Sequence, residues 1–290
     1  MMFGVFPKEH INLCTDRVPR DDGERQAGTA MEILRRFERQ PGVILADEVG
    51  MGKTFVAMAV AASTIMAYGD KGPVVVMVPP SLKEKWPKDW AVFCDKCLSH
   101  EVRGMMRSAQ ADSGMSFLRL IDDAEDKRAN IIFLTHGALH RALDDGFAKL
   151  AVIKRAFKGR SSLTAQRANF ERFAGRLLRM SSKIDRLAPD LMGTLIERPY
   201  EAWLRTIHRT HEELKVLITD DPVPRHFAEA LDDLDSAQVE ALAEALLAMP
   251  IRESTNIDER LKAIRHELST ILSEVWKELL RKASFRSPLL

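Results

Sequence analysis

Residues 43–54 of the chain read VILADEVGMGKT. The four apolar residues at 43–46 predict a short buried strand of a parallel sheet. The apolar, alanine-rich run at residues 55–68 predicts a helix. The glycines of the intervening loop, Gly50 and Gly52, have no Cβ, so the backbone can wrap closely around a ligand. A glycine loop between a strand and a helix is typical of phosphate-binding loops, because the helix N-terminus offers free N–H groups to an anion.

In such a loop, Lys53 would bridge the β- and γ-phosphates of a nucleotide, and the Thr54 hydroxyl would bind Mg²⁺. We therefore predict ATP and Mg²⁺ as cofactors, with Lys53 and Thr54 as catalytic residues and Thr54 as the metal ligand. The nucleotide-binding loop is predicted to comprise Asp47, Glu48, Val49, Gly50, Met51, Gly52, Lys53 and Thr54. Asp47 stands where the pattern G-x-x-x-x-G-K-[ST] has its first glycine, and a glycine-rich turn with an incidental lysine is the alternative.

Further elements follow this loop in alternation. A helix is predicted from Glu24 to the break at residues 40–42, with strands at 74–78 and 131–135 and helices at 81–93 and 117–125. Residues 94–114 give no clear pattern, and residues 1–23 are predicted to be an arm. Strands that alternate with helices predict a doubly wound α/β layer with a mainly parallel sheet over about residues 25–145.

The second half of the chain is predicted to be all-helical over residues 145–283. A helix at 170–187 would carry an apolar stripe beside a basic one, and residues 226–247 would form a helical region broken near Ser236, its predicted cap. Leu261, Ile264, Leu268, Ile271 and Val275 form the apolar line of a third helix at 257–282. A short β-like run at 216–219 interrupts the pattern.

The net charge of +1 conceals two opposed segments. Residues 154–186 hold ten Lys or Arg and two acids, whereas residues 220–260 hold eleven acids and three bases. The basic stripe could neutralise the phosphates of duplex DNA, or it could be a solvated face or pair with the acidic segment. The predicted DNA contacts in this stripe are Arg172, Arg176, Arg179 and Lys183.

The bulk composition predicts a globular cytoplasmic protein. The chain has 290 residues, 46% hydrophobic and 29% charged, with no apolar run near the roughly 20 residues that span a bilayer and no secretory leader. Three cysteines are too few for a disulfide framework, and a reducing location fits them. Cys94, Cys97 and His100 have metal-like spacing, but no second pair completes four ligands, so ordinary reduced cysteines are expected.

The segment ADEVGMGKT resembles motif I of the Swi/Snf-type branch of superfamily 2 helicase-like ATPases, in which an Asp-Glu pair precedes GxGKT. Three further segments match in order. Arg25-Gln26 resembles the Q motif, VVVMVPPSLKEKW at 74–86 resembles motif Ia, and NIIFLTHGAL at 130–139 resembles motif Ib. The resemblance covers residues 24–143. It implies a recombinase-like first ATPase lobe at 24–144, with adenine read by Gln26 and the DNA backbone contacted by Ser81 and Thr135.

The family implies a DNA-dependent ATPase that translocates on duplex DNA and remodels protein–DNA complexes, in bacterial DNA transactions or phage defence. Its acidic motif II is not found after a buried strand, and residues 216–221 are a poor candidate because Pro222 follows at once. We expect residues 284–290 to begin the motif II strand, which makes residues 145–283 an insertion and places the second helicase lobe elsewhere in the protein. A protein partner could bind this insertion. The alternative function is a non-catalytic nucleotide-binding or protein-interaction module.

Overall fold

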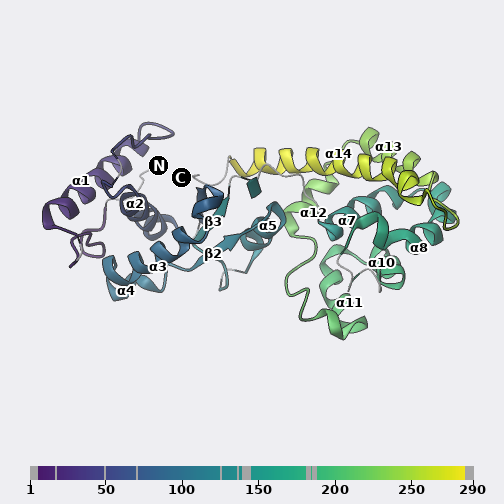
Figure 1. The fold of residues 1–290 in the computed structure, drawn as a ribbon, viewed down its shortest axis with the longest axis horizontal. Coiled ribbons are helices and arrows are strands. Elements are labelled where there is room, and N and C mark those ends of the chain that lie inside the picture. Colours follow the sequence, from purple (N-terminus) through teal and green to yellow (C-terminus); the bar gives the residue numbers. More distant parts are fainter. Residues whose placement is uncertain are drawn as a thin grey trace. The chain divides into compact units, whose positions relative to one another are not determined.

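The computed structural model describes residues 6–16, 18–48, 50–69, 71–124, 126–135, 137–138, 145–180, 184 and 188–284. The chain divides into two compact units, which we call the sheet unit (Met1–His140 with Ser284–Leu290) and the helical unit (Arg141–Ala283). The fold is mixed α/β, as the sequence predicts, with a small parallel sheet and a majority of helices (Figure 1). Among the described helices, none has both the length and the apolarity that a membrane crossing requires.

The sheet unit is built on three parallel strands, β1 (Val74–Val78), β2 (Ser108–Ala111) and β3 (Ile131–Thr135), in the order β1-β3-β2. The central strand β3 is the most buried of the three, since its first four residues are all buried. The helices of this unit are α1 (Arg20–Phe37), α2 (Lys53–Tyr68), α3 (Lys85–Cys97), α4 (His100–Arg103) and α5 (Gly114–Asp122), with a 3-10 turn η1 (Pro80–Leu82) after β1. The prediction of parallel strands at 74–78 and 131–135 is confirmed.

The core of the sheet unit explains why α2 is apolar on all sides. This helix packs against α1, α3 and β1, and nine of its residues are buried. Trp90 stacks on Phe93 with ring centroids 5.6 Å apart, beneath the sheet residue Phe133. The N-terminal segment, predicted to be an arm, also enters this core, since Phe6, Ile11 and Leu13 are buried and Ile11 forms an antiparallel bridge with Leu98.

One prediction about a strand is wrong. Residues 43–46 form no strand, and the Ile44 side chain is 92% exposed. A strand needs a neighbour for its backbone N–H and C=O groups, and no described segment pairs with this run, so its peptide groups remain without a ladder. In contrast, the small and polar residues of β2 do form a strand, because β3 supplies the hydrogen-bonding partner.

The helical unit contains α7 (Gly146–Phe157), α8 (Arg167–Leu178), α10 (Ala188–Glu197), α11 (Trp203–Thr210), α12 (Arg225–Asp232), α13 (Ser236–Leu247) and α14 (Ile257–Ser284). Short 3-10 turns connect some of them: η2 (Ser161–Gln166), η3 (Tyr200–Ala202) and η4 (Glu212–Leu214). The predicted apolar line of the last helix is confirmed, because Leu261, Ile264, Leu268, Ile271 and Val275 are all buried. The run at 216–219 lies in a turn and irregular segment after η4, with Val216 85% exposed.

Two details of the helical unit differ from prediction. The break between α12 and α13 is confirmed, but the cap is Asp235 rather than Ser236, since the Asp235 carboxylate accepts a hydrogen bond from the amide of Ala237. The single continuous helix predicted at 170–187 is wrong. Helix α8 ends at Leu178, and Arg179 adopts the left-handed conformation with φ of 54°, which stops helical hydrogen bonding.

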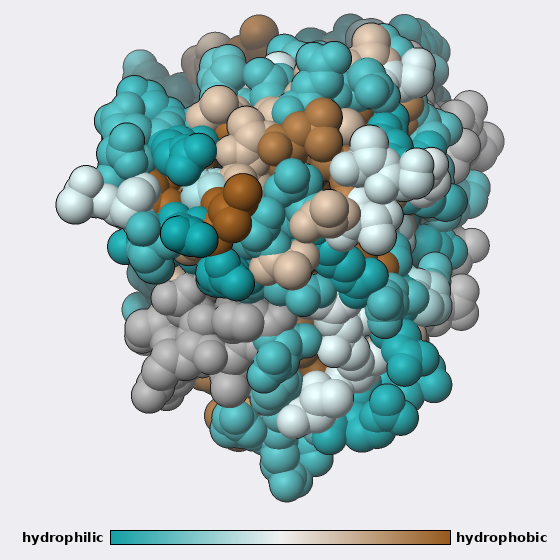
Figure 2. All heavy atoms as spheres, turned by 90° about the vertical axis from the view of Figure 1, so that its right-hand side faces the viewer, coloured by the Kyte–Doolittle hydropathy of each residue, from teal (hydrophilic) through white to brown (hydrophobic). Residues whose placement is uncertain are grey.

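One face of the helical unit is hydrophilic over most of its area, with a small group of apolar side chains (Figure 2). Leu247 and Ile251 are exposed apolar residues of this unit, at 47% and 64%. Scattered apolar residues of this kind are normal on soluble domains.

Candidate phosphate-binding site

The glycine loop has the backbone geometry of a ligand cradle. Gly50 and Gly52 have φ values of 91° and 78°, in the left-handed region that other L-residues rarely adopt. Gly52 is also the N-cap of α2, and no side chain caps this helix. The first N–H groups of α2, including those of Lys53 and Thr54, therefore have no acceptor within the helix, and the positive end of the helix dipole adds to their attraction for an anion.

The ammonium group of Lys53 lies over the same loop. Its Nζ donates to the carbonyl oxygens of Asp47 at 2.6 Å and Glu48 at 2.7 Å. A lysine ammonium has three N–H donors, so one remains for another acceptor. The side chains of Asp47 and Glu48 are exposed, and Val49 lies outside the described residues. Lys53 thus holds the start of the loop against the first turn of α2.

Two neighbouring residues of α1 hold the other end of the loop. Gln26 is buried, with 6% of its surface exposed, and its Nε2 and Cδ would lie 2.2 Å and 2.6 Å from a Cβ added to Gly52. The Gln26 side chain therefore packs directly on the backbone of Gly52. Beside it, Arg25 Nη2 donates to the carbonyl oxygen of Met51 at 3.1 Å. The sequence predicts that Gln26 reads adenine, but it gives no signal for the contact of Arg25 with the loop residue Met51.

The amide oxygen of Gln26 is a second unusual feature of this contact. Gln26 Oε1 is buried and accepts no hydrogen bond from the described part of the chain. A buried acceptor without a partner costs roughly 1–3 kcal/mol. This oxygen is therefore open to a hydrogen bond from a donor other than the described residues.

Ser81 and Thr135 follow neighbouring strands at the same edge of the sheet. Strands β1 and β3 are parallel and in register, with Val78 opposite Thr135, so both strands end at this edge. Ser81 is exposed in η1, and Thr135 is half-buried. Because α2 leads through a short turn into β1 and runs back along the sheet, its N-terminus points toward this edge, where ligands bind in α/β folds.

Ser81 does not cap the helix that follows it. Helix α3 begins at Lys85, its N-cap position is Glu84, and no side chain caps it. The residues between β1 and α3 first form η1, because Pro79 and Pro80 fix their backbone φ angles and delay the α-helix. Ser81 therefore remains available at the sheet edge.

The basic stripe of α8 is largely engaged within the chain. Arg172 donates to the carbonyl oxygen of Ile251, and Arg176 Nη1 lies 2.9 Å from the Glu253 carboxylate. These contacts match the alternative in which the stripe pairs with the acidic segment at 220–260. Arg179 lies beyond the end of the helix, and Lys183 lies outside the described residues.

Of the two cysteines on α3, Cys97 is buried and Cys94 is half-buried. Burial raises the pKa of Cys94 to about 12 and that of Cys97 to about 11, so both hold their protons at neutral pH. In the described ranges, no three His, Cys, Asp or Glu side chains are grouped so that they could hold a metal ion.

Comparison with known proteins yields partial similarities to chromatin-remodelling helicases. The chain is 39% identical over 62 residues to Helicase domino of Drosophila melanogaster, and 34% identical over 68 residues to Protein CHROMATIN REMODELING 19 of Arabidopsis thaliana. A third relative, Protein CHROMATIN REMODELING 4 of Arabidopsis thaliana, is 37% identical over 65 residues. No family model and no solved structure matches the chain.

These similarities are short on both sides. They cover 21%, 23% and 22% of this chain and 2%, 9% and 3% of the respective relatives. The chain therefore matches less than a tenth of the length of each of these relatives. The similarities support a helicase-like superfamily of the SWI/SNF type.

Proposed function

We propose that the sheet unit is the ATP-binding lobe of a DNA-dependent ATPase of the Swi/Snf helicase-like type. The observation that carries this proposal is the loop at residues 50–54, where two left-handed glycines precede an uncapped helix that begins with Lys53 and Thr54. Similarity to chromatin-remodelling helicases supports the same class of protein.

The residues of the loop fit a Mg·ATP ligand. A Cβ at Gly50 would meet no atom within 4 Å, so the space beside this residue is open. The amides at the start of α2 would bind the phosphates, Lys53 would bridge the β- and γ-phosphates, and the Thr54 hydroxyl would coordinate Mg²⁺. The unpartnered Gln26 Oε1 would accept a hydrogen bond from the amino group of adenine once its side chain turns from Gly52. The Mg²⁺ ion would neutralise charge that develops on the phosphates during transfer.

The DNA would lie along the carboxyl edge of the sheet. Ser81 and Thr135 carry hydroxyl groups at this edge, and hydroxyl groups commonly donate to DNA phosphates. ATP bound at the N-terminus of α2 and DNA bound beside β1 and β3 would then meet at one edge. We propose translocation on duplex DNA, with remodelling of protein–DNA complexes or a role in bacterial DNA transactions or phage defence, as the use of this arrangement.

The first experiment measures nucleotide binding by the whole chain. A fluorescent ATP analogue is titrated with Mg²⁺ into the wild-type protein and the Lys53→Ala variant. Loss of a charge-assisted contact to phosphate should weaken binding at least about tenfold, which corresponds to about 1.4 kcal/mol. Lys96→Ala is the matched control, because Lys96 is an exposed lysine of the same unit that pairs only with its neighbour Asp95.

Equal affinity of the wild-type and Lys53→Ala proteins would remove this loop as the ATP site. In a protein that hydrolyses ATP, the same variant should also abolish the DNA-stimulated turnover. A urea unfolding curve of each variant shows whether a loss of binding comes from a loss of folding.

A non-catalytic nucleotide-binding or protein-interaction module is the second candidate function. One observation favours it: no Asp-Glu pair follows any of the three strands in the described residues, and the run at 216–221 lies in a turn. Mg²⁺ coordination by carboxylates is what hydrolysis would add to binding. Tight ATP binding without hydrolysis, in a protein that contains both helicase lobes, would support this second function.

A further inference from the structure

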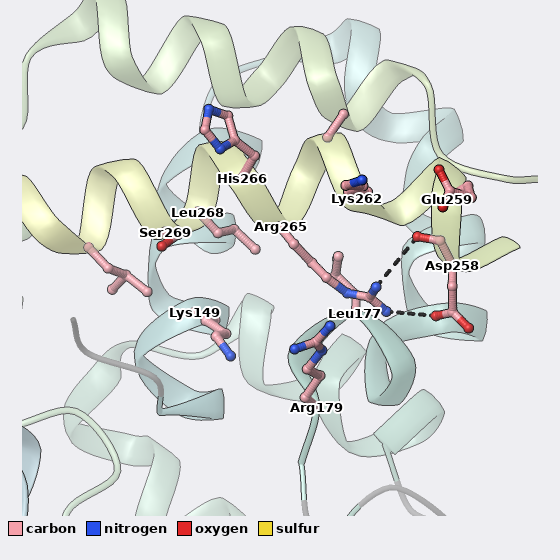
Figure 3. Close-up of a pocket in the computed structure, with 12 residues that line it drawn as sticks. Lys149, Leu177, Arg179, Asp258, Glu259, Lys262, Arg265, His266, Leu268 and Ser269 are labelled. Carbon is pink, nitrogen blue, oxygen red and sulfur yellow. Dashed lines mark hydrogen bonds and ion pairs between the residues drawn. The ribbon is translucent and has the colours of Figure 1, made fainter. Parts of the chain in front are cut away.

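A cavity of about 1040 Å³ opens in the helical unit between α7, the end of α8 and the first half of α14 (Figure 3). Its charged lining is mostly basic. Lys149 comes from α7, Arg179 from the end of α8, and Lys262, Arg265 and His266 from α14, against the two carboxylates Asp258 and Glu259.

Two of these cations have a structural role at the end of α8. Lys149 Nζ donates to the carbonyl oxygen of Leu178 at 3.3 Å, and Arg265 Nη2 donates to that of Arg176 at 3.0 Å. The last carbonyl groups of a helix receive no hydrogen bond from within the helix, and they lie at the negative end of its dipole. Cations therefore stabilise this end. The Asp258 carboxylate lies 2.9 Å from Arg265 Nη2 and forms an ion pair with it, so one of the two carboxylates is already paired.

Helix capping does not account for Arg179 and Lys262. Neither residue forms an ion pair with a carboxylate within the described part of the chain. The charge of Arg179 nevertheless acts on Asp258 in the cavity lining. The hydrogen bond from Arg265 holds the pKa of Asp258 below its usual range, and the charges of Arg176 and Arg179 add to this effect.

Arg179 also occupies a backbone position that favours glycine. Among the described residues other than glycine, it is the one with a positive φ, and this C-terminal position usually holds glycine. Backbone strain of this kind persists where surrounding structure fixes it, and it is frequent at functional sites. In Figure 3, the guanidinium group of Arg179 lies below that of Arg265, whose nitrogens face Asp258, and the ammonium group of Lys149 lies on the same side of α14.

We propose that this cavity binds the phosphate backbone of duplex DNA and gives the protein a second DNA contact. The proposal rests on the proposed function, since that function makes DNA the substrate. Grouped cations with few opposing carboxylates attract a polyanion, and the phosphates of DNA supply closely spaced negative charge. Arg172 and Arg176 are already bound to residues 251–253, so the contact moves from the predicted stripe on α8 to Arg179, Lys149 and α14.

The test is fluorescence anisotropy of a labelled duplex of arbitrary sequence, titrated with the whole chain at several salt concentrations. Arg179→Gly and Lys262→Gln each remove one phosphate contact, so each should weaken binding several-fold and lower the salt slope of the affinity by about 1. Arg225→Gln is the matched control, because Arg225 is an exposed arginine of the same unit outside the cavity. It should keep the wild-type slope.

The Arg179→Gly protein has a built-in control for folding. Glycine relieves the positive φ, so its urea midpoint should equal or exceed the wild-type midpoint while its DNA affinity falls. Wild-type affinity and salt slope in both variants would overturn the cavity as a DNA contact, even if Lys53 variants still lose ATP.

Discussion

Gly52→Ala tests whether Gln26 supports the phosphate loop. Two separate costs follow from the structure. The backbone φ of 78° is strained for alanine, which costs roughly 1–2 kcal/mol in the left-handed region. The added carbon would also lie 2.2 Å from Gln26 Nε2, so the buried end of the Gln26 side chain would have to shift. Overpacking of a core typically costs about 1–3 kcal/mol.

The sum of these costs predicts that Gly52→Ala lowers the free energy of unfolding by about 2–5 kcal/mol. Gly50→Ala is the matched variant, since Gly50 has a φ of 91° but open space around an added Cβ. Gly50→Ala should lower the free energy of unfolding only by the cost of the backbone conformation, roughly 1–2 kcal/mol. The double variant Gly52→Ala with Gln26→Ala removes the overlap, so its coupling energy should have the opposite sign to the overlap cost.

Urea unfolding of the wild type, the two glycine variants, Gln26→Ala and the double variant, followed by tryptophan fluorescence, measures these differences. Gly28→Ala reports the general effect of alanine in α1, where no atom lies near the added Cβ, and it should stabilise by about 0.5–1 kcal/mol. The reasoning fails if Gly52→Ala costs no more than Gly50→Ala, because Gln26 would then not press on the loop.

Two further predictions concern titrating groups in the sheet unit. Hydrogen bonds from Arg35 and Arg36 lower the pKa of Glu32 to about 2, below its unfolded value, so this carboxylate stabilises α1 above about pH 4.5 and loses that effect as the pH falls toward 2. A carboxyl titration by NMR should give a midpoint near 2 at low salt and a higher one at high salt, and an unshifted midpoint would disprove the pairing. Because burial raises the pKa of Cys94 and Cys97 to about 12 and about 11, iodoacetamide at pH 8 should modify them only after urea is added, as mass spectrometry would show. Rapid labelling of the native protein would contradict their burial.

The elements predicted well from the sequence are those whose signal is local. The strands at 74–78 and 131–135 are β-branched and apolar, and α14 repeats its apolar residues at helical spacing. Each pattern reports one buried face, and burial follows the pattern directly. The glycines of the loop were identified for a similar reason, because a positive φ is a property of single residues.

The elements predicted badly depend on partners that are distant in the sequence. Residues 43–46 are as apolar as a strand but have no described neighbour, whereas the small residues of β2 pair with β3 and form one. Arg176 meets Glu253, 77 positions later, and this pairing decides how much of the basic stripe remains open. The residues around Arg176 in the sequence do not predict that contact. The hydrogen bond from Arg25 to the carbonyl oxygen of Met51 also joins residues that are distant in the sequence, so it was not predicted either.

The bonds of Lys53 set a condition on nucleotide binding. Its ammonium already donates to the carbonyl oxygens of Asp47 and Glu48, and hydrogen bonds from charged groups contribute roughly 1.5–3 kcal/mol each. A phosphate can accept a hydrogen bond from the third N–H of Lys53, or it can replace these carbonyl groups as acceptor. A charged phosphate oxygen is a stronger acceptor than a neutral carbonyl oxygen. Arg25 and Gln26 hold Met51 and Gly52 independently of Lys53. The lysine can therefore exchange its partners while the amides at the start of α2 keep their positions. For this reason, Lys53→Ala should lose nucleotide affinity while these amides stay in place, whereas Gly52→Ala should lose both affinity and stability.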